Sequence, residues 1–138
     1  MPTTTTTHLN FRGEARQALE FYRSVSGGEL TIATYGDLGA AQQPSQADQV
    51  MWGQVLAPGG FHVMAYDVQP EKPFDRGENA FYVALRSGTA EENRALWDGL
   101  SDGANVLQPL GAAPWSASYG MLTDRCGITW VLDVESDH

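Results

Sequence analysis

Few side chains in this sequence combine the type and the spacing that catalysis or metal binding requires. The three histidines, His8, His62 and His138, lie far apart, and no HxH, HxxxH or CxxC spacing brings two ligands together on one element. The one cysteine, Cys126, follows Arg125, whose charge would favour the reactive thiolate. No histidine is near Cys126 in the sequence, so a turn cysteine without a chemical role is the simpler interpretation. His138 ends the chain, where order is least expected.

The stronger signal is a set of aromatic residues on predicted strands and loops. Aromatic and apolar walls with a few polar groups are typical of a small-molecule pocket. The residues that we expect to line such a cleft are Asn10, Trp52, Gln54, His62, Met64, Tyr66, Trp115, Tyr119 and Trp130, with Asp67 and Phe81 as further candidates. For most of these aromatics the alternative is a place in the core between sheet and helix. Trp115 differs, because it follows a proline in a loop of small residues, where a mobile aromatic can close a pocket.

The composition indicates a soluble globular protein. The chain has 138 residues, of which 42% are hydrophobic, and its net charge is −9 with a pI near 4.5. Because its eight lysines and arginines form no basic stripe, nucleic acid and anionic membranes are not expected partners. The N-terminus lacks the features of a signal peptide, and no apolar run is long enough to span a membrane. One cysteine permits no intrachain disulfide, so we expect a cytoplasmic protein.

The first half of the chain contains one helical pattern and four β-favouring runs. Apolar residues from Ala15 to Val25 recur at spacings of three and four, which predicts an amphipathic helix. Glu14 is predicted in the first turn of this helix, and Gly27 is predicted to end it. The predicted elements are a strand at 7–12, a helix at 14–26, a strand at 29–35, a loop at 36–48, and strands at 49–56 and 60–68.

The second half repeats this order. Thr89 and Glu92 have the spacing of a capping box, and Ala95, Leu96 and Leu100 form a helical apolar stripe. The predicted elements are a strand at 81–85, a helix from 89 to about 103, a short strand at 106–107, a loop at 109–118, and strands at 119–123 and 128–134 around a turn at 124–127.

The repeated order favours an internal duplication over chance alternation. The last strands of the two halves also look alike, because both 59–68 and 126–134 end in Asp-Val. We therefore predict one α+β domain over 1–138, with a first module at about 7–68 and a second at about 79–134.

Four segments give the chain a family resemblance: LNFRGEARQALEFYRSVSGGEL, MAYDV, LWDGLSDGANVLQPL and PWSASYGMLTDRCGITWVLDV. They resemble the PhnB-like branch of the vicinal oxygen chelate superfamily, which also contains glyoxalase I, the bleomycin-resistance proteins and the extradiol dioxygenases. The resemblance implies paired βαβββ modules whose mixed sheets curl around a cleft, usually completed in a homodimer. Some relatives are described as 3-demethylubiquinone 3-methyltransferase-like, but this sequence has neither a glycine-rich nucleotide loop nor room for a methyl-donor domain.

The resemblance also implies where a metal would bind. The superfamily's enzymes hold a divalent metal through His, Glu or Gln on the first and last strands of each module. The corresponding positions here are Thr7, Val63 or Met64, Phe81 and Val131. None is a good metal ligand, so we expect no metal cofactor. The alternative is one divalent metal held by a displaced set, His8, His62, Glu78 and Asp133, each of which also has an ordinary place on a surface, in a loop or at a strand end.

Three functions therefore stay open at this point. The first is a metal-free protein that binds a small aromatic or planar molecule in its cleft. The second is a metal-dependent lyase, isomerase or dioxygenase that uses the displaced ligands. The third is an accessory protein whose dimer surface is its functional part. In each case we expect a homodimer.

Overall fold

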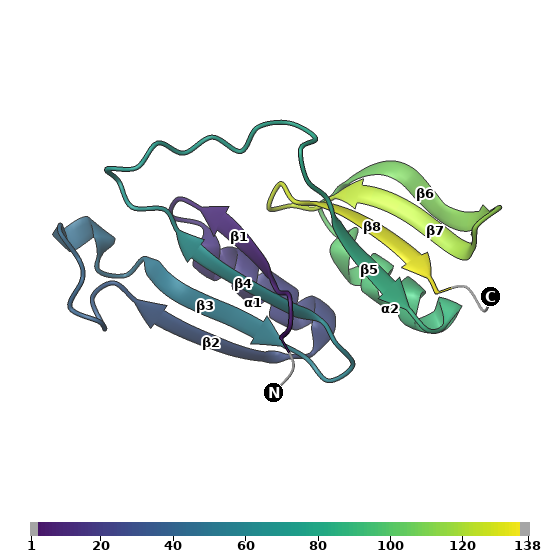
Figure 1. The fold of residues 1–138 in the computed structure, drawn as a ribbon, viewed down its shortest axis with the longest axis horizontal. Helices are drawn as coiled ribbons and strands as arrows, with labels where there is room; N and C mark the ends of the chain where they lie inside the picture. The colour runs from purple at the N-terminus through teal and green to yellow at the C-terminus, as the bar shows by residue number, and fades with distance from the viewer. Residues whose placement is uncertain (1–2, 136–138) are drawn as a thin grey trace. The chain divides into compact units, whose positions relative to one another are not determined.

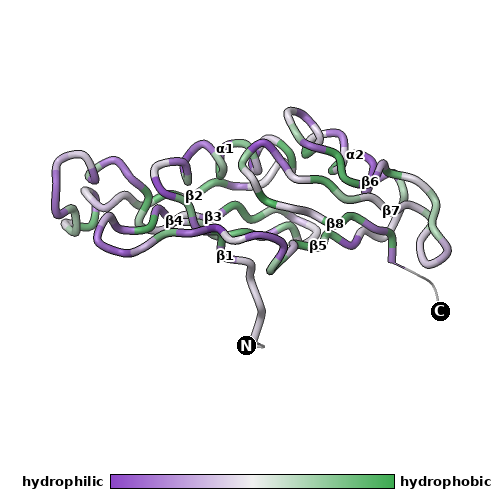
Figure 2. Tube along the Cα trace, turned by 90° about the horizontal axis from the view of Figure 1, so that it is seen from above, coloured by the Kyte–Doolittle hydropathy of each residue, from purple (hydrophilic) through white to green (hydrophobic). Residues whose placement is uncertain are grey.

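The computed structural model describes residues 3–135 and divides the chain into two compact units, with the boundary between Arg76 and Gly77. Within the described residues each unit runs strand, helix, strand, strand, strand (Figure 1). This confirms the predicted α+β class and the repeated βαβββ order. Hydrophobic residues concentrate in the strands (Figure 2). No helix of the described residues is long and apolar enough to cross a membrane. His138 lies outside them.

The first unit is a mixed sheet with one helix against it. Its strands pair in the order β1-β4-β3-β2, with β1 parallel to β4 and the other pairs antiparallel. Its elements are β1 (Thr7–Phe11), α1 (Ala15–Ser26), β2 (Glu29–Thr34), the 3-10 helix η1 (Pro44–Gln46), β3 (Val50–Leu56) and β4 (His62–Asp67).

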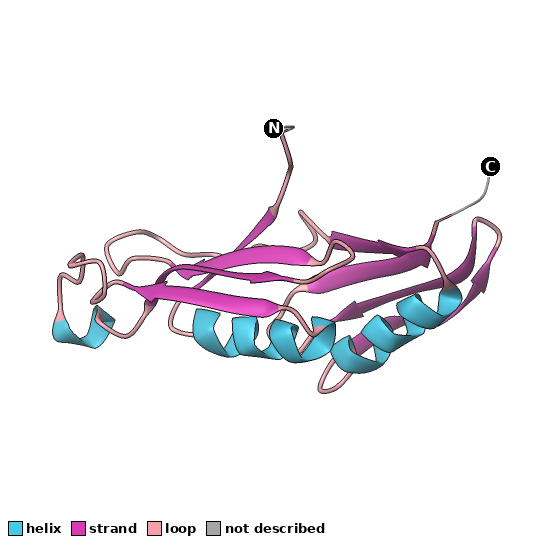
Figure 3. Cartoon of the chain, turned by 90° about the horizontal axis from the view of Figure 1, so that it is seen from below, coloured by secondary structure: helices cyan, strands magenta, loops and turns pink. Residues whose placement is uncertain are grey.

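Helix α1 lies against one face of this sheet (Figure 3). Its predicted stripe is confirmed, since Ala15, Leu19 and Tyr22 are fully buried. Gly27 ends the helix in the left-handed conformation at φ 72°, and its N–H donates to the Arg23 carbonyl. Glu14 was predicted in the first turn, and that placement is wrong. Glu14 precedes the helix as its N-cap, and its side chain makes no capping hydrogen bond.

A buried carboxylate from β4 takes the place of a capping side chain at the start of α1. Asp67 Oδ1 accepts hydrogen bonds from the N–H groups of Gly13 at 2.6 Å and Ala15 at 3.1 Å, and its Oδ2 accepts from Val50 at 2.8 Å. The Tyr35 hydroxyl donates to the Asp67 carbonyl. Asp67 therefore joins β4 to α1 and β3, and the prediction that it lines a cleft is wrong because its side chain faces the core.

The connection after β4 stays on the first unit as far as Arg76. The Arg12 guanidinium donates to the Gln69 carbonyl at 3.2 Å and also to the Lys72 carbonyl. The same group lies over the Phe74 ring, 5.5 Å from its centre. The first unit thus extends beyond residue 68, where the sequence placed the end of its module.

The second unit repeats the topology, with strand order β5-β8-β7-β6 and β5 parallel to β8. Its elements are β5 (Val83–Ser87), α2 (Ala90–Leu100), β6 (Asn105–Ala113), β7 (Ser116–Thr123) and β8 (Thr129–Val134). Two predictions are wrong here. The first strand begins after Phe81, whose side chain is 93% exposed. The predicted loop at 109–118 is mostly strand, with Pro114 and Trp115 as its turn.

The sequence predicted only residues 106–107 of strand β6, because the composition of the rest is typical of a loop. It contains Pro109 and Gly111, and its pairing with β7 shifts register between Val106 and Gln108 and again on either side of Gly111. A proline has no N–H to donate to a neighbouring strand, so it fits only where one edge of the strand is unpaired. β6 is the edge of this sheet, which satisfies that condition.

Helix α2 begins as predicted but buries a different face. The Thr89 hydroxyl accepts from the Glu92 N–H at 3.1 Å. The buried side chains are Asn93, Trp97 and Leu100, whereas the predicted Ala95 is exposed. The Trp97 ring lies over Gly120 of β7, where an added Cβ would come within 2.7 Å of it. A glycine in the sheet therefore makes room for a tryptophan on the helix.

Equivalent hydrogen bonds align the two units residue by residue. The Val68 N–H donates to the Phe11 carbonyl, and the Glu135 N–H donates to the Ser87 carbonyl in the same way. This alignment makes Asp133 equivalent to Tyr66, not to Asp67. The shared Asp-Val ending that supported the duplication was therefore offset by one position, although the duplicated topology itself is confirmed.

Candidate functional site

Six of the predicted cleft residues share one face of the first sheet. Side chains alternate along each strand, and the side that carries buried Leu9, Val55 and Ala65 is covered by α1. The opposite side, which we call the outer face of the first sheet, carries Asn10, Trp52, Gln54, His62, Met64 and Tyr66, together with His8. Met64 pairs across strands with both His8 and Gln54, and Asn10 pairs with Tyr66, so these side chains are neighbours.

Both histidines on this face have protein partners. His62 Nε2 lies 2.8 Å from Gln54 Oε1, and His62 Nδ1 lies 3.3 Å from Thr6 Oγ1. With the Gln54 oxygen as acceptor, Nε2 carries the proton and Nδ1 accepts from the Thr6 hydroxyl. His8 Nδ1 lies 2.9 Å from Asn10 Oδ1, and the His8 ring meets Tyr66 edge-on at 5.3 Å. Both histidines are thus held by hydrogen bonds within the first unit.

Trp115 and Tyr119 come together in the second unit, beside a pocket. Their rings meet edge-on with centres 5.1 Å apart. The pocket has a volume of about 560 Å³, within the range typical of ligand sites. Strands β6 and β7 supply its lining, with Leu107, Gln108, Gly111, Tyr119 and Met121 among the residues that contribute. Trp115 is 58% exposed in a two-residue turn, so it belongs to a fixed hairpin and not to the long loop that the sequence indicated.

Trp130 was predicted to line the cleft, and that placement is wrong. Its side chain has no exposed surface, and its indole N–H donates to Asp124 Oδ2 at 2.7 Å. Trp130 pairs with Val83 on one side and Leu122 on the other, along the side of the sheet that α2 covers. It belongs to the core of the second unit.

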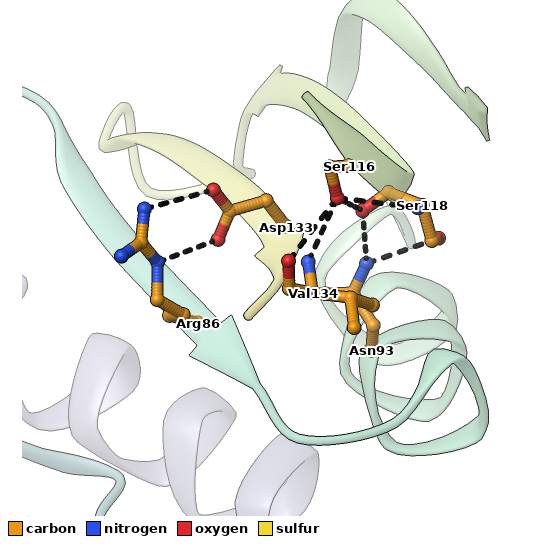
Figure 4. A network of polar contacts seen from close by, with 6 residues as sticks. All are labelled: Arg86, Asn93, Ser116, Ser118, Asp133 and Val134. Carbon is orange, nitrogen blue, oxygen red and sulfur yellow. Dashed lines mark hydrogen bonds and ion pairs between the residues drawn. The ribbon is translucent and has the colours of Figure 1, made fainter. Parts of the chain in front are cut away.

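The side of the second sheet away from α2, its outer face, joins the pocket to an ion pair. Met121 of the pocket pairs with Val131, and Asp133 follows on the same side of β8. Arg86 of β5 pairs with Asp133 and binds its carboxylate through Nε at 3.3 Å and Nη2 at 3.4 Å. Figure 4 shows these two side chains pointing toward each other. The sequence analysis missed Arg86, since an arginine on a short strand gives no signal until its strand partner is known.

The structure also places the residues considered as metal ligands. Thr7 and Val63 pair with each other on the side of the first sheet that α1 covers, and Phe81 lies outside β5. Of the displaced set, His8 and His62 share the outer face of the first sheet, Asp133 binds Arg86, and Glu78 is exposed in the segment of the second unit that precedes β5. Over residues 3–135, no three His, Cys, Asp or Glu side chains gather closely enough to hold a metal ion.

Cys126 lies in the predicted turn between β7 and β8. Its N–H donates to Asp124 Oδ1 at 2.8 Å, and the Ile128 N–H donates to the same oxygen at 3.1 Å. The residue is half-buried and its backbone helps to hold the turn. Its position is explained by the turn, as the sequence suggested.

The family follows from the sequence match and the fold together. The model of the glyoxalase/bleomycin resistance protein/dioxygenase superfamily matches residues 7–132. The chain belongs to this superfamily. No protein with a curated description matches the chain.

Solved structures agree with this membership and with the predicted branch. Protein PA1353 from Pseudomonas aeruginosa is 31% identical, with a TM-score of 0.83, over 99% of this chain and all of the other. A PhnB protein from Bacillus cereus is 27% identical, with a TM-score of 0.72, over 96% of this chain and all of the other. A domain of the same superfamily from Frankia sp. EAN1pec has a TM-score of 0.69 at 13% identity, over 99% of both chains. The predicted resemblance to the PhnB-like branch is therefore confirmed.

Proposed function

We propose that this protein binds a small planar aromatic molecule, without a metal, against Trp115 and Tyr119 of the second unit. One observation carries the proposal: a pocket of about 560 Å³ whose wall includes an edge-on aromatic pair. Tyr119 and Met121 offer flat or polarisable surface, and Gln108 supplies an amide that can fix a ligand's orientation. The larger cleft to which the first unit would contribute, and the homodimer that would complete it, stay predictions.

Binding of a neutral planar probe to the pocket tests the proposal. In equilibrium dialysis we expect 2-naphthamide to bind the full chain and the Trp115→Ala variant to bind it about tenfold more weakly, because one aromatic wall is lost. Phe81→Ala is the matched control, since it removes an exposed aromatic side chain that is not part of the pocket wall. Equal binding by wild type and Trp115→Ala would contradict the proposal.

A metal-dependent activity is the second candidate, and one observation favours it. His8 and His62 lie on adjacent strands of the same outer face, so two nitrogen ligands are available within the first unit. Elemental mass spectrometry of untagged protein, purified without chelator, separates the two candidates. Close to one metal ion per chain, lost in a His8→Ala, His62→Ala double variant, would favour the metal-dependent activity over the metal-free binding protein. Metal well below one equivalent, even after metal is supplied and the excess removed, favours the metal-free binding protein.

A further inference from the structure

A row of side chains leads from the pocket to the ion pair on the outer face of the second sheet. Gly111 pairs with Tyr119 across β6 and β7, and Arg86 pairs with Asp133 across β5 and β8. Tyr119 and Asp133 flank the paired residues Gly120 and Leu132, so they are neighbours on the same side. Adjacent strands lie about 4.8 Å apart, and Arg86 is two strands away from Tyr119. The backbones of these two residues are therefore roughly 10 Å apart. A bicyclic aromatic ring with one substituent spans that length.

The two partners of the ion pair are not equally open to a ligand. The Arg86 side chain is 65% exposed, whereas the Asp133 side chain is only 15% exposed. The Asp133 carboxylate accepts hydrogen bonds from Nε and Nη2 of Arg86, and Nη1 of Arg86 takes no part in this ion pair. A molecule on this face therefore meets a guanidinium with a donor to spare before it meets the carboxylate.

The strand end that carries Asp133 is held in place from the buried side. Ser116 Oγ accepts from the Val134 N–H at 3.1 Å and also lies 3.3 Å from the Val134 carbonyl (Figure 4). Asn93 of α2 donates to the Ser118 carbonyl and hydroxyl next to it. Because these contacts fix the end of β8 against β7, Asp133 can fix the plane of the Arg86 guanidinium. Asp133 is thus a positioning residue, and Arg86 is the group that touches the ligand.

We infer that the ligand is an aromatic anion whose ring lies against Trp115 and Tyr119 and whose carboxylate or similar group accepts hydrogen bonds from Arg86. This inference rests on the proposed function, since it assigns the charged end of a ligand bound at the same pocket. Hydrogen bonds between a guanidinium and a carboxylate are among the stronger ones in proteins, because both groups are charged. The site therefore selects for charge as well as for shape, in a protein whose net charge of −9 would otherwise repel anions.

The test compares two probes of the same ring, 2-naphthoate and 2-naphthamide, by equilibrium dialysis against the full chain. We expect wild type to bind the anionic probe roughly tenfold more tightly than the neutral one, and Arg86→Gln to abolish that preference while binding 2-naphthamide unchanged. Unchanged binding of the neutral probe also shows that the variant is folded. Arg94→Gln is the control, because the Arg94 side chain is about as exposed as that of Arg86 and also binds an aspartate, but it lies on α2, so this variant should keep the preference.

The outcomes separate this inference from the proposal on which it rests. If 2-naphthamide binds in a manner that depends on Trp115 but 2-naphthoate binds no better, the pocket stands and the anion site is overturned. Equal losses of both probes in Arg86→Gln also overturn it, because the arginine would then act on the pocket as a whole. If neither probe binds the wild type, the proposed function fails and the inference fails with it.

Discussion

In the first unit a buried carboxylate lies at the end of β4, whereas in the second it lies in the turn between β7 and β8. Asp67 accepts from three backbone N–H groups and joins the start of α1 to β3. Asp124 accepts from the N–H groups of Cys126 and Ile128 and from the Trp130 indole, and joins the turn to the core. Both units nevertheless have the same strand order. Each unit therefore satisfies backbone N–H groups with a buried carboxylate, but at a different position of the same topology.

What the units do share is a glycine beneath the helix. Gly53 pairs with Ala65 and Gly120 pairs with Leu132, at equivalent points of the two sheets. A Cβ on Gly53 would meet Leu19 of α1, and one on Gly120 would meet Trp97 of α2. The position that stays constant is thus the one that sets how closely the helix approaches the sheet. The outer faces, which the helices do not touch, have diverged into a histidine-bearing surface and an arginine-bearing one.

The largest expected difference in stability is between variants of the two aspartates that precede valine at the strand ends. Asp67→Ala leaves three N–H groups without their acceptor in the core, and should lower the free energy of unfolding by about 3 kcal/mol or more. Asp133→Ala breaks one ion pair whose arginine is exposed to solvent, and should cost about 1 kcal/mol. Urea denaturation followed by circular dichroism measures both. Equal losses would show that the one-residue offset between the units has no energetic meaning.

If Asp67→Ala does not fold, Asp67→Asn keeps one side-chain oxygen and provides a milder variant. Its loss of stability should fall between those of Asp67→Ala and Asp133→Ala, since one of the two acceptor atoms remains.

The next effect compares the two glycines. Gly120→Ala places its Cβ 2.7 Å from the rigid Trp97 ring and 3.1 Å from the Leu110 backbone, so it should cost about 2–3 kcal/mol. Gly53→Ala meets the end of the flexible Leu19 side chain, which can turn aside, so it should cost about 1 kcal/mol. Thermal unfolding of the two variants gives the order. A greater loss of stability in Gly53→Ala would mean that the contact between α1 and its sheet adapts less easily to an added methyl group than the contact of α2.

The smallest effect concerns the connection between the second and third strands of each unit. Residues 35–49 make this connection in the first unit, and Pro114 and Trp115 make it in the second. The Thr34 N–H, and then its hydroxyl, hold the pKa of Asp37 below its usual value. Because the pKa is lowered on folding, the stabilisation is complete above the pKa of the unfolded chain and is lost as pH falls through the folded pKa.

NMR titration of the Asp37 carboxyl should therefore show a pKa below that of an ordinary aspartate, and Thr34→Val should move it back upward. The second unit has no counterpart of this loop, so the change should leave the amide signals of β6 and β7 unaltered. An Asp37 pKa that does not respond to Thr34→Val would show that the Thr34 hydroxyl contributes nothing, and would leave the Thr34 N–H as the cause.

Much of the fold could be predicted from local chemistry. Gly27 and Thr89 mark helix ends through their own backbone or side-chain preferences, and both were placed correctly. His62, Met64 and Tyr66 were all expected to line one cleft, and the register places them on one face of β4. These features depend on residues close together in the chain.

The failures concern residues whose role depends on a distant partner. Trp97 is buried because Gly120 leaves space for it, and neither residue reveals the other in the sequence. Trp130 turns toward the core because its strand pairs with Val83 and Leu122 in one register, and a shift of one residue would have turned it outward. Of the predicted site, the outer face of the first sheet and the Trp115–Tyr119 pair therefore remain as surfaces, while Trp130 and Asp67 do not.

The proline in β6 has a consequence for how the protein behaves at high concentration. A long strand at a sheet edge is a template on which other chains can assemble, and exposed apolar residues such as Val106 and Leu107 strengthen that tendency. Pro109 removes one donor from the edge, and the repeated register shifts bend the strand away from the flat form that fibrils require. We therefore expect the irregularity that made most of β6 resemble a loop to disfavour aggregation through this edge.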